Sequence, residues 1–311
     1  HLSLRRQRQM CIRDSGKEIG TAGYYAATVD HSIRAELTVT ERTGMARYTF
    51  SSKEKQGTVI IGGGVAATSI QVAAIKITGP HSCEGYAEGG AFCGIPTPYK
   101  VYFVAEFDAD AENFGTWKEE RLHANHTFAE GSHSGVYFTF PLKEGNQAVQ
   151  YKIGVSYVSV ENARENLRVE NPAWDFSAVR QATQDKWNEY LGKIEIEGDN
   201  EDRQMQFYTH LYRSLIHPNV CSDVNGEYMG ADSQVHKTAR KFYTSFSNWD
   251  TYRTQTALIA MLAPEETSDI VMSHYLFAEQ SGGGFPRWVL ANIETGVMQG
   301  DPTPILVANA Y

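Results

Sequence analysis

The stretch PYKVYFVAEF, residues 98–107, decides the first half of the fold. Its aromatic and β-branched residues recur at every second position, and side chains of a strand alternate between the two faces of a sheet. The pattern therefore predicts a β-strand with one face inward. Similar runs stand on both sides of it, at residues 33–40, 46–50, 58–61, 69–77, 135–140 and 148–158. Many short strands separated by Gly and Asn/Asp clusters indicate a sandwich or a barrel.

Helical periodicity replaces this pattern after residue 158. We predict helices at 160–169, after the cap Asp175, after Asp199-Asn200, at 251–262, and at 266–280, where the glycines 282–284 end the last one. Strands and helices are thus segregated, which indicates an α+β multidomain chain and not an alternating parallel sheet. We expect a strand domain over 16–158, a helical linker over 159–198 and a helical domain over 199–311.

Composition excludes several classes of partner. Charged residues make up 21% of the 311, and the net charge of −9 disfavours nucleic acid and anionic membranes. No apolar run approaches the roughly 18 residues that a membrane-spanning helix needs. The basic segment 1–15 differs in composition from residues 16–311; it is either a tail for an acidic partner or, as we expect, a non-native leader without the apolar core of a signal peptide.

The cysteines and the glycine-rich motifs point to no metal or nucleotide chemistry. Cys83 and Cys93 are close enough in sequence to pair in an oxidising compartment, although free buried thiols are common, and no CxxC spacing occurs. The triplet at 62–64 lacks the spacing of a phosphate-binding loop. Neither a GxSxG elbow nor an HExxH pair is present.

Three segments combine aromatic residues, carboxylates and glycine at positions that we expect to be loops. They are EGYAEGGAFCG (84–94), SNWDTYR (247–253) and SGGGFPRWVLANIETGVMQGD (281–301). An aromatic ring stacks on the apolar face of a sugar, while carboxylates and arginine bind its hydroxyls. The composition suits a carbohydrate site, but ordinary buried aromatics and solvated charges would give it as well.

The sequences of these segments resemble those of glycoside hydrolase family 92, the inverting α-mannosidases. The resemblance lies in FYTHLYRSLIHPNVCSDVNGEYMG (207–230), YTSFSNWDTYRTQ (243–255) and GGFPRWVLANIETGVMQGD (283–301). Upstream, AGYYAATVD (22–30), AELTVTERTGMARYTF (35–50) and CGIPTPYKVYFVAEF (93–107) resemble the strand half of that family. Essentially all of residues 22–311 is covered.

The resemblance implies a β-sandwich followed by the start of an (α/α)6 barrel, in a bacterial exo-acting enzyme. It implies removal of terminal α-linked mannose from N-glycans or mannans, with calcium as cofactor. Hydrolysis in such enzymes is a single displacement by an acid and a base that stand about 6.5–9.5 Å apart. It also implies export to the periplasm, the cell surface or the medium, since glycans are the partners.

Site residues follow from the resemblance position by position. Trp249 and Asp250 match residues that hold the terminal mannose, although Asp250 could instead cap a helix while Trp249 lies in a core. Phe92 and Cys93 match a pair that reaches into the pocket, or they simply pack. Three residues of the last segment are also assigned to the pocket: Arg287, Trp288 and Glu294. Arg287 and Glu294 could instead form a plain ion pair.

The chain departs from the family pattern at Ile293, where we expect the asparagine of a glycine-asparagine pair, and at Asn309, where we expect aspartate. We further expect an internal fragment, with the catalytic acid, the base and most calcium ligands beyond Tyr311. The departures keep open a non-catalytic mannose-binding protein on the same scaffold. A third alternative is another (α/α)6 glycosidase or phosphorylase that acts on glucosides. Linkage specificity is not encoded in these residues.

Overall fold

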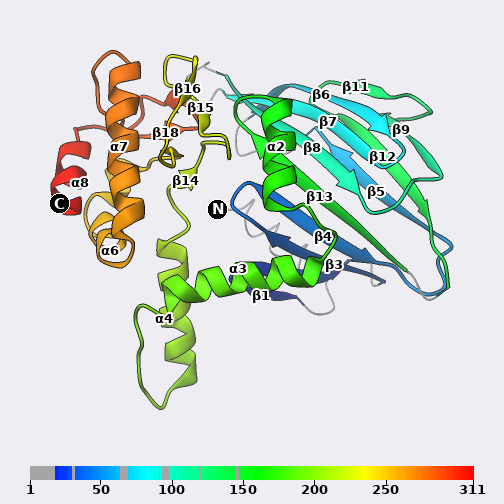
Figure 1. Cartoon of the computed structure of the whole chain (residues 1–311), viewed down its shortest axis with the longest axis horizontal. Coiled ribbons are helices and arrows are strands. Elements are labelled where there is room, and N and C mark those ends of the chain that lie inside the picture. Colours follow the sequence, from blue (N-terminus) through cyan, green and yellow to red (C-terminus); the bar gives the residue numbers. More distant parts are fainter. Residues whose placement is uncertain are drawn as a thin grey trace.

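The computed structural model describes residues 18–29, 32–63, 69–90, 92, 98–119, 121–144 and 147–311. Figure 1 shows a strand-rich half and a helical half side by side, with α2 (Val160–Glu170) at the boundary between them. The expected leader, residues 1–15, lies outside the described residues. The predicted order of a strand domain followed by helices is confirmed.

Two antiparallel sheets form the strand-rich half. Within the described residues, the large sheet runs in the order β1 (Ile19–Thr21), β2 (Tyr24–Val29), β3 (Ile33–Val39), β4 (Thr43–Thr49), β13 (Ala148–Ser156), β8 (Tyr99–Phe107), β7 (Ser82–Gly90), β6 (Ser69–Gly79), β11 (Phe128–Glu130). The small sheet runs β10 (Arg121–Ala124), β9 (Asn113–Lys118), β12 (Ser134–Pro141), β5 (Gln56–Gly62). All seven predicted strand runs fall on strands of these sheets.

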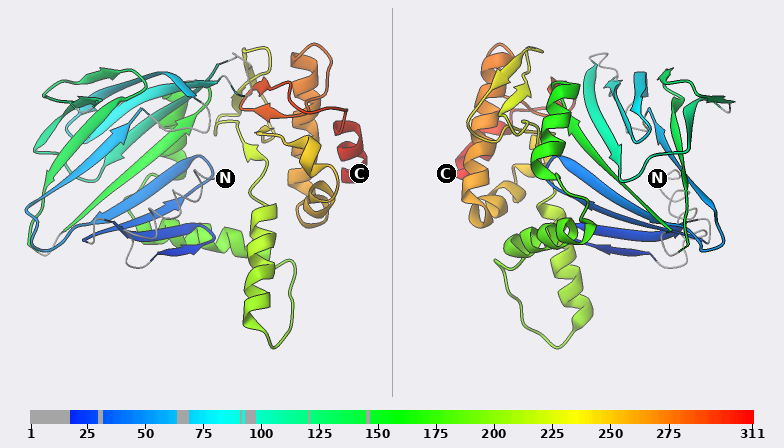
Figure 2. Two further views of the ribbon diagram at one scale, coloured as in Figure 1. Left: turned by 180° about the vertical axis from the view of Figure 1, so that it is seen from behind. Right: turned by 45° about the vertical axis from the view of Figure 1, so that its right-hand side comes forward.

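The core of this half lies between the two sheets, as in a β-sandwich. Phe107 of β8 projects from the large sheet onto Phe138 and Phe140 of β12, with ring centroids 4.9 and 4.8 Å apart. All three rings are buried. Figure 2 shows the two layers from two further directions. The alternation in 98–107 therefore has the predicted consequence that every second side chain enters the core.

Helices cover the other face of the large sheet. Helix α2 begins at the cap Ser159 and packs Ala163 and Leu167 on Val104 of β8. Its close approach needs Gly154 on β13, because a Cβ there would clash with the Ala163 carbonyl oxygen. Helix α3 (Phe176–Leu191) begins at the predicted cap Asp175 and lies along β2, β3 and β4.

The helical half contains short ribbons between its helices. The helices are α4 (Glu201–Ser214), α5 (Asn248–Thr251), α6 (Gln255–Leu262), α7 (Pro264–Gln280) and α8 (Thr303–Ala310). The ribbons pair β14 (Asn219–Val220) with β17 (Tyr243–Thr244), β15 (Glu227–Met229) with β16 (Val235–Lys237), and β18 (Val289–Leu290) with β19 (Ile293–Glu294). Helix α4 extends away from both halves (Figure 1).

Two predicted elements differ from the structure. The segment 84–94 is not entirely a loop, since residues up to Gly90 belong to β7 in the middle of the large sheet. Its glycines serve close strand packing: a Cβ on Gly85 would clash with the Ala74 carbonyl oxygen. The helix predicted over 251–262 is divided into α5 and α6, because Thr254 leaves the helical conformation at φ −138°.

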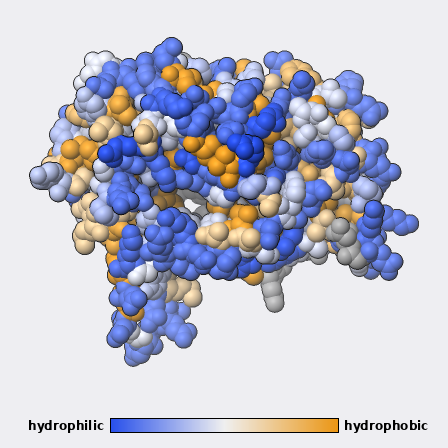
Figure 3. All heavy atoms as spheres, in the orientation of Figure 1, coloured by the Kyte–Doolittle hydropathy of each residue, from blue (hydrophilic) through white to orange (hydrophobic). Residues whose placement is uncertain are grey.

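The end of α7 agrees with its prediction. Gly282 and Gly283 follow it with φ of 93° and 104°, and the Gly283 amide closes the helix by donating to the Ala278 carbonyl. None of the helices in the described ranges is long and apolar enough to cross a membrane. On the face drawn in Figure 3 hydrophilic side chains predominate, with small hydrophobic patches among them.

Candidate functional site

Two of the singled-out segments lie against each other in the helical half. Ser247 and Trp288 form an antiparallel bridge, and the Asn248 amide donates to the Arg287 carbonyl at 3.0 Å. The Val289 amide donates in turn to the Phe246 carbonyl at 2.8 Å. Residues separated by about forty positions thus become neighbours, which sequence spacing alone does not reveal.

Asp250 and Trp288 meet at the surface beside this bridge. The Trp288 indole Nε1 lies 3.3 Å from Asp250 Oδ2, and the Ser247 hydroxyl lies 2.5 Å from the same oxygen. Asp250 is exposed, as is Trp249 at 37% of its surface. The alternative of a buried Trp249 is therefore wrong. An exposed carboxylate beside an indole can accept hydroxyl hydrogen bonds and offer a stacking face.

Phe92 reaches this place from the strand-rich half. Its ring stacks on the Trp288 indole, with centroids 5.2 Å apart and planes 5° from parallel. The two rings join the loop after β7 to the 285–301 loop, so the candidate site is shared by both halves. Cys93 lies outside the described residues. Trp249, Asp250, Phe92 and Trp288 are thus gathered around the two loops.

Arg287 and Glu294 organise the second loop through backbone contacts. The Glu294 carboxylate accepts from the amides of Arg287 at 2.8 Å and Trp288 at 3.2 Å. The Arg287 guanidinium donates to the Val297 carbonyl at 2.7 Å. No ion pair joins these two side chains, both of which are described, so the plain ion-pair interpretation is wrong. Their carboxylate and guanidinium hold the backbone that carries Trp288.

The two departures from the family pattern have local partners. Asn309 donates from its side-chain amide to the Tyr252 carbonyl at 2.8 Å, a contact that an aspartate could not donate. Ile293 pairs with Leu290 in the β18–β19 ribbon, whose turn contains Ala291 at φ 56°. The Thr244 hydroxyl donates to the carbonyl of this strained alanine. Asn309 thus contacts the residue that follows α5, and Ile293 belongs to the β18–β19 ribbon.

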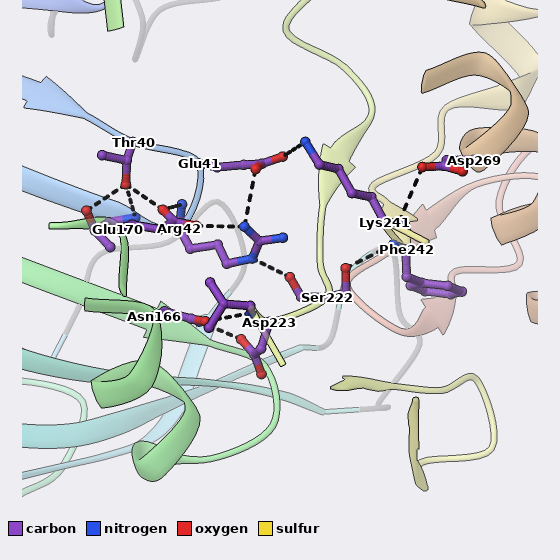
Figure 4. Close-up of polar contacts among 12 residues, drawn as sticks. Thr40, Glu41, Arg42, Asn166, Glu170, Ser222, Asp223, Lys241, Phe242 and Asp269 are labelled. Carbon is purple, nitrogen blue, oxygen red and sulfur yellow. Dashed lines mark hydrogen bonds and ion pairs between the residues drawn. The ribbon is translucent and has the colours of Figure 1, made fainter. Parts of the chain in front are cut away.

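A polar network missed at the sequence level joins the two halves (Figure 4). Asp223 is 4% exposed and accepts from Ser156, Asn162 and Asn166 at 2.7, 2.8 and 2.6 Å. Burial raises the pKa of Asp223 above its ordinary value, against the effect of these three donors. A short polar residue between Cys221 and a Gly226 turn gave no signal of this role, because its partners lie some 60 positions upstream.

A second part of the same network is ionic. The Arg42 guanidinium pairs with Glu170 at 2.6 Å and donates to the Ser222 carbonyl at 2.5 Å. Lys241 pairs with Glu41 at 2.5 Å (Figure 4). The turn after β3, helix α2 and the first loops of the helical half are therefore tied together.

The described residues include two buried thiols and no cluster of metal-binding side chains. Among the described side chains, no three His, Cys, Asp or Glu residues come together in a way that could hold a metal ion. Cys83 and Cys221 are buried free thiols, and burial raises the pKa of Cys83 to about 12. A pairing of Cys83 with Cys93 concerns a residue outside the described ranges.

His274 of α7 is fully buried behind the site and is a pH-sensitive element of the fold. Burial lowers its pKa from 6.5 to about 4. Because the pKa is lower in the folded chain than in the unfolded chain, stability is complete above pH 6.5 and is lost as the pH falls from 6.5 towards 4. The loss is about 1.4 kcal/mol per pH unit for this one group.

We therefore expect His274→Gln to reduce the acid dependence of the melting temperature between pH 6.5 and 4.5. The comparison uses thermal unfolding of the wild type and the variant over this range. The exposed His210→Gln serves as the control, since it also replaces a histidine with glutamine but at a position outside the core. A wild-type slope in His274→Gln would contradict the assignment of this proton to His274.

Comparisons with known proteins identify the family of the chain. Residues 4–156 match the glycosyl hydrolase family 92 N-terminal domain, and residues 162–311 match the family 92 catalytic domain. A family 92 α-mannosidase of Bacteroides thetaiotaomicron is 25% identical with a TM-score of 0.85 over 94% of this chain and 40% of its own. A family 92 inverting mannosidase of the same species is 25% identical with a TM-score of 0.83 over 94% and 39%.

A secreted relative is similar in sequence as well. It is an uncharacterized secreted glycosidase of Arthroderma benhamiae, 27% identical over 78% of this chain and 33% of its own length. The chain thus spans about 40% or less of the relatives it matches. Two domains of one family, matched one after the other over nearly every residue, leave one assignment: the chain belongs to glycosyl hydrolase family 92.

Proposed function

We propose that the protein containing this chain removes terminal α-linked mannose from N-glycans or mannans, and that this chain supplies part of the pocket for the terminal sugar. The observation that carries the proposal is the exposed Asp250 carboxylate beside the Trp288 indole, with Phe92 stacked behind it. The two relatives named as mannosidases share this chain's fold over 94% of its length.

Each side chain has a role that fits its geometry. Asp250 would accept hydrogen bonds from two sugar hydroxyls, exchanging its contact with Ser247 for the ligand. Trp249, exposed and 5.9 Å from the Arg253 guanidinium, would form a wall of the pocket. The Trp288 and Phe92 pair would form the opposite wall, because a stacked pair presents one fixed aromatic edge to the sugar.

We do not assign the acid and base to this chain. The site contains two carboxylates, Asp250 and Glu294. Because backbone amides occupy the Glu294 carboxylate, Asp250 is the one that a ligand can reach. The inverting single displacement and the assistance of calcium belong to the proposal for the whole protein. In this proposal most of the calcium ligands come from other parts of the protein. Secretion is proposed from the substrate class and from the secreted relative.

The test is release of mannose by the full-length product of the gene that encodes this chain. We expect mannose to be released from α-mannobiose in buffer with calcium, and the rate to fall at least tenfold after chelation and to return when calcium is restored. Proton NMR of the first product would show β-mannose if the displacement is single.

Two outcomes would contradict parts of the proposal. Mannose binding without release would assign a non-catalytic carbohydrate-binding role instead. Release of glucose from glucosides, with mannosides untouched, would overturn the substrate class. A matched reaction with α-glucobiose controls for non-specific hydrolysis.

A further inference from the structure

The side chain of Asn248 is buried beside the candidate site. Asn248 precedes Trp249 and Asp250 in the sequence and is only 1% exposed. Its amide nitrogen donates to the Pro286 carbonyl and to the Thr303 hydroxyl oxygen, each at 2.9 Å. Because Pro286 precedes Arg287 and Trp288, this amide connects the two segments that carry Asp250 and Trp288.

Thr303 closes the contact into a ring. Its hydroxyl accepts from Asn248 and donates to the same Pro286 carbonyl at 2.5 Å. A carbonyl can only accept, so the amide nitrogen of Asn248 must face Pro286 and its oxygen must face the other way. Both donors of the amide are therefore used, and its orientation is fixed.

The oxygen of Asn248 faces helix α7. It lies 3.1 Å from Nε2 of His274, whose ring is stacked on Phe246 at 3.8 Å. Four segments consequently meet at one side chain: α5, the loop before Trp288, the start of α8, and α7. A cavity of about 30 Å³ lies beside them, lined partly by Asn248, Phe246 and Leu306.

We propose that Asn248 and Thr303 are positioning residues that set the separation between the Asp250 carboxylate and the Trp288 indole. The inference rests on the proposed function of this site, and neither residue touches the sugar. A residue that served packing alone would not need each polar atom of its amide directed at a different segment. Loss of the ring would let the 285–288 loop shift, which would weaken sugar binding more than turnover.

The test compares Thr303→Val with Thr303→Ser in the full-length gene product. Valine keeps the shape and removes the hydroxyl, whereas serine keeps the hydroxyl. We expect Thr303→Val to raise KM for an α-mannoside about tenfold with kcat nearly unchanged, and Thr303→Ser to restore the wild-type KM. A purely structural role would lower the active fraction, and hence kcat, at constant KM.

A second measurement does not depend on sugar. With 5-fluorotryptophan incorporated, the ¹⁹F resonance of Trp288, assigned by its loss in Trp288→Phe, should shift in Thr303→Val and in Asn248→Ala. It should not shift in Asn171→Ala, an equally buried asparagine at the end of α2. This readout remains valid if the wild type releases no mannose, which would refute only the proposed function.

The proposal is overturned if the Trp288 resonance in Thr303→Val coincides with that of the wild type. It is also overturned if the resonance shifts in an active enzyme while KM stays unchanged. If Asn248→Ala fails to fold, the comparison of Thr303→Val with Thr303→Ser still tests the proposal.

Discussion

Asp250→Ala should reduce kcat/KM for mannoside release by roughly a hundredfold. The carboxylate is the exposed charged acceptor of the site, and hydrogen bonds to charged groups contribute about 1.5–3 kcal/mol each. Loss of two such bonds to sugar hydroxyls amounts to roughly 3 kcal/mol, or about two decades in the rate constant. The measurement is steady-state release of mannose by the full-length gene product, with the affinity for mannose measured by calorimetry.

Asp199→Ala is the matched control for this substitution, since Asp199 is an exposed carboxylate in the segment before α4. Its kinetics should equal those of the wild type. Asp250→Asn separates charge from shape, because the amide keeps one acceptor and should lose less than alanine. A kcat/KM in Asp250→Ala within twofold of the wild type would remove Asp250 from the sugar pocket.

Asp223→Ala should lower the free energy of unfolding by about 3 kcal/mol and separate the melting of the two halves. The substitution leaves the Ser156 hydroxyl without its acceptor and removes one of two acceptors from the amides of Asn162 and Asn166, and a buried donor left unpaired costs about 1–3 kcal/mol. Removal of the Asp223 carboxylate also removes the free-energy cost of burying its charge, which offsets part of this loss. Differential scanning calorimetry should show one transition in the wild type and two in the variant.

The exposed Asp185 of α3 offers a control with the same side chain. Asp185→Ala should change the free energy of unfolding by less than about 0.5 kcal/mol, as surface substitutions usually do. If Asp223→Ala melts in a single transition at the wild-type temperature, the network of Figure 4 does not hold the two halves together.

Much of the fold could be predicted because its signals are local. Alternation in 98–107 identifies β8, and Asp175 and the glycines after Gln280 mark the ends of helices through their own backbone. The segment 84–94 misled because glycine and small residues are typical of loops. In β7 they permit close contact with β6, which is a property of the neighbouring strand and not of the segment itself.

The residues of the candidate site also differ in whether a local sequence signal identifies them. Trp249, Asp250 and Trp288 stand in distinctive segments, and the structure places them together with Phe92. Thr303, His274 and Asp223 stand in no such segment, and Asn248 stands in one without being assigned a role, since each contacts partners 17 or more positions away. Polar residues in otherwise apolar surroundings, such as His274 within α7, were the available hint.

The stacking of Phe92 on Trp288 also bears on whether the two domains can be exchanged between relatives. Each ring is encoded in a different domain, so neither domain carries the aromatic wall as a transferable module. A chimaera that joins the first domain of one relative to the second domain of another could conserve both folds and still present mismatched rings. The stack therefore couples the two domains, because replacing the ring on one side changes the surface on which the other ring packs.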